Sequence, residues 1–120
     1  MKKLFAMAVP ILPNQTERWT KFINTLKGEK YNEFKASRTA LGVWERTFLQ
    51  HTPMGDFVIV TLEGKNPEES FTKFGQGNDA FTTWFKQEVK EIHGIDLASP
   101  PQGKLPELIV DSGELSTASR

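Results

Sequence analysis

The stretch Gly42–Gly64, GVWERTFLQHTPMGDFVIVTLEG, decides the fold of this 120-residue chain. It contains two runs that suit a pleated strand, Val43–His51 and Phe57–Glu63, separated by the turn sequence TPMGD at 52–56. β-Branched and aromatic residues are concentrated in the second run, and proline and glycine mark the turn. The stretch therefore predicts a β-hairpin, and we expect the rest of the chain to pack around it.

The register of this hairpin decides which polar side chains share a face, because a slip of one residue turns every side chain of a strand over. If residue 51 lies opposite 57, all the polar residues of the hairpin share one face; if it lies opposite 56, they divide between two faces. We expect the 51-to-57 register, because it leaves Val58, Val60 and Leu62 as an apolar face for the helices. The polar residues concerned are Glu45, Thr47, His51, Thr61 and Glu63.

Composition limits the kinds of partner. Fifteen Lys and Arg residues balance fifteen Asp and Glu residues, so neither a nucleic acid nor an anionic membrane surface is an expected partner. The chain has no cysteine, which excludes thiol catalysis, disulfides and thiolate metal sites and fits a cytoplasmic protein. The length is that of one ordinary domain.

An apolar run, Leu4–Leu12, follows two lysines near the start of the chain. It is shorter than the roughly 20 apolar residues of a membrane span, and no small-residue cleavage site follows it, so we interpret it as a strand rather than a secretory signal. Its alternate residues are apolar on both faces, and such a strand needs a cover on each side. The two faces carry Phe5, Met7 and Val9, and Leu4, Ala6 and Ala8.

Four helical segments are predicted around the hairpin. Asn14, followed three residues later by Glu17, indicates the start of the first, and the second is expected from Lys30 to Leu41. Asn66-Pro67 indicates the start of the third, and Asn78 or Asp79 that of the fourth.

The fourth helix should end at about His93, and a short last strand is expected at Leu108–Val110. We therefore expect a single domain over residues 1–113 and a disordered tail over 114–120.

This order of elements is that of the ferredoxin-like β-α-β-β-α-β unit, an α+β fold with one antiparallel sheet and helices on one face. Together with the two-sided first strand, it makes the chain resemble the dimeric α/β-barrel superfamily. The segments ALGVWER, LQHTPMGDFVIVTLEG, DAFTTWF and EIHGIDL are similar to those of small bacterial proteins in that superfamily. The resemblance implies a homodimer with a cavity between two sheets. It implies no single activity, because members include monooxygenases, isomerases and proteins without known activity.

Two histidines are the candidates for acid–base chemistry near neutral pH. His51 is either a proton acceptor or a solvated residue at a strand end. His93 lies at a helix C-terminus, where it is expected to bond the last carbonyls, with Asp96 either orienting it or starting the next loop. The two histidines fall in different elements without a metal-binding motif, so no metal site and no cofactor are expected.

Two arginines, Arg38 and Arg46, are expected to face inward. Each is suited either to hold a ligand carboxylate or to pair with Glu45 or Glu63 in a structural network.

Two functions remain open from the sequence. The first is a homodimeric binding module that holds a mainly apolar small molecule in the cavity between the sheets. The alternative is a cofactor-independent monooxygenase or isomerase in which His51 accepts a proton; a purely structural role is a third possibility. The candidate binding residues are Arg38, Trp44, Glu45, Arg46, His51, Phe57, Glu63, Trp84 and His93.

Overall fold

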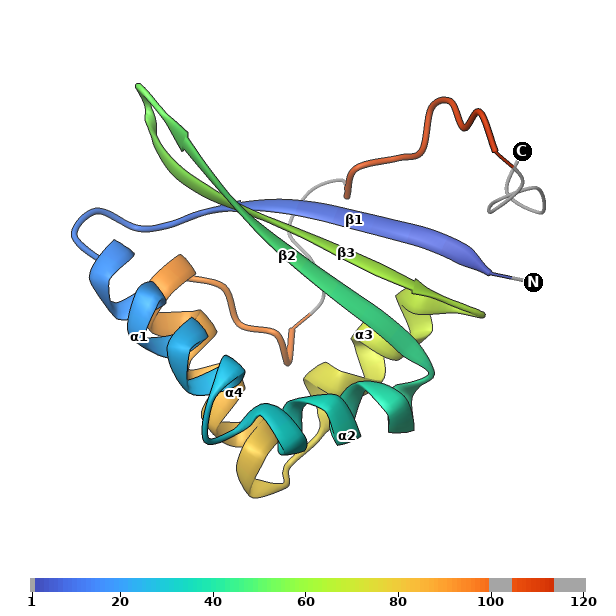
Figure 1. Ribbon diagram of the computed structural model, residues 1–120, viewed down its shortest axis with the longest axis horizontal. Coiled ribbons are helices and arrows are strands. Elements are labelled where there is room, and N and C mark those ends of the chain that lie inside the picture. The colour runs from blue at the N-terminus through green and yellow to red at the C-terminus, as the bar shows by residue number, and fades with distance from the viewer. Residues whose placement is uncertain (1, 100–104, 114–120) are drawn as a thin grey trace.

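The computed structural model describes residues 2–99 and 105–113 of the chain. The described residues have the α+β fold class expected from the sequence. Three strands form one antiparallel sheet in the order β1-β3-β2, and the helices all cover the same face of it (Figure 1). The elements are β1 (Lys3–Pro10), α1 (Thr16–Lys27), α2 (Tyr31–Leu41), β2 (Val43–Thr52), β3 (Gly55–Gly64), α3 (Pro67–Gln76) and α4 (Ala80–His93).

The predicted hairpin is confirmed as β2 and β3, but its predicted register is wrong. His51 lies opposite Asp56, and Thr52 lies opposite Gly55, so only two residues form the loop. The Thr52 hydroxyl donates to the Gly55 carbonyl at 2.6 Å and accepts from the Met54 amide at 3.1 Å. Gly55 has a φ of 118°, which suits glycine far better than a residue with a side chain. Because a two-residue loop replaces the expected five-residue loop, the pairing shifts by one residue.

This register divides the polar residues of the hairpin between the two faces of the sheet. Glu45 and Thr47 lie opposite Leu62 and Val60 and therefore share the face that the helices cover. Glu63 and Thr61 instead share the outer face with their partners Trp44 and Arg46. The expected gathering of all five polar residues on one face is therefore wrong.

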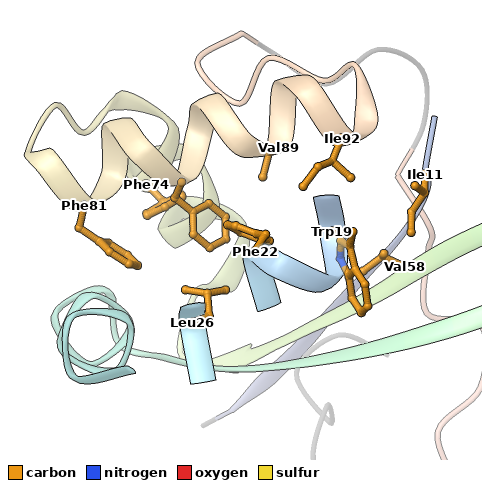
Figure 2. Close-up of a cluster of buried hydrophobic side chains, with 10 residues drawn as sticks. Ile11, Trp19, Phe22, Leu26, Val58, Phe74, Phe81, Val89 and Ile92 are labelled. Atoms are coloured by element: carbon orange, nitrogen blue, oxygen red, sulfur yellow. The ribbon is translucent and has the colours of Figure 1, made fainter. Parts of the chain in front are cut away.

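The main core lies between β3 and the helices α1, α3 and α4. Phe85 packs edge-on against Phe22 and Phe74, with ring centroids 5.1 Å apart in both pairs. Ile92 has no exposed surface, and Figure 2 shows it pointing with Val89 from α4 towards α1. A smaller cluster of Phe5, Val43 and Leu62 lies at the other end of the sheet.

The starts of α3 and α4 are capped as predicted. The Asn66 side chain accepts a hydrogen bond from the Glu69 amide, and the Asp79 side chain accepts one from the Thr82 amide. The predicted cap of α1 by Asn14 is wrong, because Asn14 has a φ of 67° and the helix begins one residue later, without a side-chain cap. A capping residue normally has extended backbone, which the left-handed conformation of Asn14 does not provide.

The predicted strand at Leu108–Val110 is also wrong. The segment 105–113 pairs with no strand in the described residues, and Ile109 and Val110 are 79% and 83% exposed. In Figure 1 this segment runs past β1 to the side of the sheet away from the helices, although its first residues, Leu105 and Pro106, still border the space between the sheet and the helices. The outer edge of β1 therefore has no neighbouring strand in the part of the chain that the structure describes. The expected tail over 114–120 lies outside the described residues.

Candidate functional site

A cavity of about 540 Å³ lies between the sheet and the helices that cover it. The sheet contributes the apolar side chains of β1 and β3, and the helices contribute aromatic and aliphatic side chains. The segment that follows α4 also borders the cavity through Ile95 and Leu97. The volume is within the range of about 300–1,000 Å³ that is typical of small-molecule sites. Apolar residues of the wall include Val9, Phe22, Leu26, Val58, Val60 and Phe85.

The cavity brings together only part of the predicted site. Arg38, Glu45 and His93 line it, whereas Trp84 and His51 do not. The remaining candidates lie on the outer face of the sheet, which no helix covers in the part of the chain that the structure describes: Trp44, Arg46, Phe57 and Glu63. The cavity expected from the sequence lies between the sheets of two chains, on the outer face of each sheet. The cavity in the structure lies within one chain, on the face of the sheet that the helices cover.

One end of the cavity carries a buried ion pair between α2 and β2. The Arg38 Nε donates to a Glu45 carboxylate oxygen at 2.7 Å, and both side chains are only 9% exposed. The Arg38 Nη1 donates to the Ser37 hydroxyl at 2.9 Å, and the guanidinium carbon lies 4.2 Å from the ring centroid of Phe74. Of the two roles considered for Arg38, the structure shows the pairing with glutamate.

A second arginine–glutamate pair lies on the outer face of the sheet. The Arg46 Nη1 donates to Glu63 at 2.8 Å, with the Arg46 side chain 51% exposed. Trp44 is 57% exposed beside this pair, and the Lys2 ammonium lies 3.8 Å from its ring centroid. Because solvent screens it, this pair contributes far less to stability than its short distance suggests.

The other end of the cavity is bordered by His93, the last residue of α4. The residue is 8% exposed, and its Nδ1 lies 2.8 Å from the carbonyl oxygen of Pro10 at the end of β1. Because a carbonyl only accepts, Nδ1 carries the proton. Burial lowers the pKa of His93, and the bond to Pro10 opposes this effect in part. At neutral pH, a lowered pKa favours the neutral imidazole of His93, in which Nε2 is an acceptor.

The predicted bond from His93 to the last carbonyls of its helix is wrong, whereas the alternative that Asp96 starts the next loop agrees with the structure. His93 bonds the end of β1 rather than the last carbonyls of its own helix. Asp96 does not orient it, because the Asp96 carboxylate accepts from the Ala98 amide and the Ser99 hydroxyl instead. These two bonds, in that order, lower the pKa of Asp96. No signal in the sequence identifies Pro10 as the partner, since 83 positions separate the two residues.

His51 lies at the tip of the hairpin, with its side chain 72% exposed. Its Nδ1 is 2.7 Å from one carboxylate oxygen of Asp56, and the Thr16 hydroxyl donates to the other oxygen at 2.8 Å. The bonds from His51 and Thr16 lower the pKa of Asp56. These contacts tie the hairpin tip to the start of α1, which matches the interpretation of His51 as a residue at a solvated strand end.

Trp84 belongs to the helix layer rather than to the cavity wall. Its ring centroid lies 5.2 Å from that of Phe22, and the Lys30 ammonium lies 5.1 Å from the Trp84 ring. The residue therefore contributes to the packing of α1 against α4.

Across residues 2–99 and 105–113, no three His, Asp or Glu side chains gather in a way that could hold a metal ion. None of the helices described is both long enough and apolar enough to cross a membrane.

Comparisons of the chain with protein-family models, with curated proteins and with solved structures found no match.

The two arginine–glutamate pairs offer a matched test of burial. Glu45→Ala leaves the Arg38 guanidinium buried without a counter-charge, so we expect a loss of about 3–5 kcal/mol in the free energy of unfolding. Glu63→Ala breaks the more exposed pair on the outer face and should cost about 1 kcal/mol or less. Urea denaturation measures both values, and equal losses would contradict the arrangement described here.

The burial of His93 predicts a pH dependence of stability. Its folded pKa lies below the value of about 6.5 of the unfolded chain, so below that pH the unfolded chain binds a proton that the folded chain does not. His93 therefore lowers stability as the pH falls through about 6.5, with a limiting slope of about 1.4 kcal/mol per pH unit. His93→Asn keeps an N–H donor for Pro10 but does not titrate, so its denaturation curves should show a smaller loss between pH 7.5 and 5. An unchanged slope would contradict this expectation.

Proposed function

We propose that the protein binds a mainly apolar small molecule in the cavity between its sheet and its helices. The observation that carries the proposal is the composition of this 540 Å³ cavity, which has mostly apolar walls and a few polar side chains. Sites of this kind obtain affinity from apolar contact and orientation from a small number of polar groups.

Two of the polar contacts beside the cavity lie near its opposite ends. Glu45 pairs with Leu62 and Pro10 pairs with Phe57, so the Arg38–Glu45 pair and the bond from His93 to Pro10 are five residues apart along β3. At about 3.3 Å per residue, this separation is roughly 16 Å. The arrangement supports an elongated ligand with its apolar body along β3.

The alternative of a monooxygenase or isomerase that uses His51 as its proton acceptor has less support. His51, the proton acceptor that it requires, lies outside the cavity wall and is bonded to Asp56. A binding protein requires only the apolar walls and the orienting groups, both of which the cavity has.

Binding of the neutral dye N-phenyl-1-naphthylamine tests the proposal, because its fluorescence rises when it enters an apolar site. We expect saturable binding with one dye molecule per chain and a dissociation constant no tighter than a few micromolar. Burial of about 300 Å² of apolar dye surface at about 25 cal/mol per Å² gives about 7.5 kcal/mol, which corresponds to about 3 μM, and the costs of association weaken the affinity from this limit.

Two neighbouring positions of β3 provide a variant and its control. Val60 lines the cavity, and Ile59 points to the outer face. Val60→Phe should fill part of the cavity and weaken dye binding by at least about tenfold, whereas Ile59→Phe should leave it within about twofold. Circular dichroism checks that both variants fold. The absence of saturable binding, or equal effects of the two variants, would contradict the proposal.

We also propose that two copies of the chain pack through the outer face of the sheet as a dimeric α/β barrel, in which each copy contributes its three-stranded sheet in place of the four strands of a full ferredoxin-like unit. In the described residues no helix covers this face, although Trp44 and Phe48 are 57% and 54% exposed on it. Apolar residues of β1 and β3 continue the face: Leu4, Ala6, Ala8, Phe57 and Ile59. Burying such a patch against a second copy would remove it from water.

Phe48→Glu tests the dimer, because an unpaired carboxylate in an apolar contact costs several kcal/mol. Light scattering at micromolar concentration should show a dimer for the unchanged chain and a monomer for this variant. Asn32→Glu introduces the same charge on the exposed side of α2 and should leave the dimer intact. A monomer for the unchanged chain would refute the dimer without affecting the cavity.

A further inference from the structure

His93 carries a buried hydrogen-bond acceptor that no described residue uses. The residue is 8% exposed and borders the cavity, and its Nδ1 proton is donated to the Pro10 carbonyl. The neutral ring then presents a lone pair at Nε2, for which the described residues provide no donor. A buried acceptor without a partner costs free energy, so a donor from outside the chain would be favourable at this point.

We propose that Nε2 of His93 accepts a hydrogen bond from a hydroxyl group of the bound molecule. This inference rests on the proposed function and narrows the ligand class to apolar molecules that carry a phenolic or alcoholic hydroxyl. In the free protein a water molecule would be the natural donor at Nε2, and the ligand hydroxyl replaces it.

The other polar groups of the cavity do not favour an anionic ligand. The Arg38 guanidinium is already paired with Glu45 at 2.7 Å, so the charge at that end is neutralised. The Asp96 carboxylate is engaged by Ala98 and Ser99 and would repel an anion. Nε2 of a neutral imidazole accepts a hydrogen bond, and an ionised carboxylate has no donor to offer it, so a neutral donor fits His93.

A pair of ligands isolates the hydrogen bond. 2-Naphthol has a hydroxyl that donates, and 2-methoxynaphthalene has the same ring system without a donor. The variant His93→Asn places its side-chain amide near the position of Nδ1, so it keeps a donor for Pro10 while it removes Nε2.

Isothermal titration calorimetry of the full chain gives the affinities of both ligands. His93→Asn should weaken 2-naphthol binding by about 3- to 10-fold, as expected for one net hydrogen bond, and change 2-methoxynaphthalene binding by less than about twofold. His51→Asn, at the exposed hairpin tip, should change neither affinity. Thermal unfolding checks that each variant is folded.

A second measurement does not depend on a folded variant. The ¹⁵N resonance of His93 Nε2 in the unchanged chain should shift on addition of 2-naphthol and stay near its original position on addition of 2-methoxynaphthalene.

The outcomes separate this inference from the proposed function. Both naphthalenes could bind with affinities that His93→Asn changes equally, and could cause equal shifts of the Nε2 resonance. That result would refute the hydroxyl contact but leave the apolar site in place. If N-phenyl-1-naphthylamine binds but 2-naphthol does not, the hydroxyl class is likewise refuted. If neither the dye nor the naphthalenes bind, the proposed function itself is refuted.

Discussion

The pairing of β2 with β3 is the constraint on which the rest of the structure depends. A two-residue loop sets His51 opposite Asp56, and every later pair along the hairpin follows from it. This register places Glu45 on the side of the helices, where Arg38 of α2 reaches it. A slip by one residue would bring Trp44 and Arg46 to that side and leave the buried guanidinium without its carboxylate, at a cost of several kcal/mol. The ion pair and the loop therefore favour the same register.

The same register explains why the cavity lies where it does. Val58, Val60 and Leu62 face the helices from the central strand, so the apolar wall and the Arg38–Glu45 pair share one face. At the far end, the bond from His93 to Pro10 joins the end of α4 to the end of β1. The two polar contacts hold helices against the sheet at both ends, and apolar side chains line the space between them.

Local signals in the sequence predicted the hairpin, the α+β class and the starts of α3 and α4. The caps at Asn66 and Asp79 involve residues three positions apart, so their chemistry is visible in a short window. The register was not predictable in this way, because the loop residues Pro53 and Met54 are not among the pairs that mark two-residue hairpins, such as Asn-Gly. The bond from His93 to Pro10 joins distant positions, and the unpaired state of Leu108–Val110 depends on tertiary contacts that an apolar run does not reveal.

The register can be measured directly by nuclear Overhauser effects between backbone protons of β2 and β3. The structure predicts that the strongest cross-strand contacts of Thr47 are to Val60, and those of Glu45 to Leu62. In the other register Thr47 would instead lie opposite Thr61, and Glu45 opposite Glu63. Contacts of Thr47 to Val60 would support the placement of Glu45 beside the cavity. Contacts of Thr47 to Thr61 would contradict it and, with it, the site built on the helix side of the sheet.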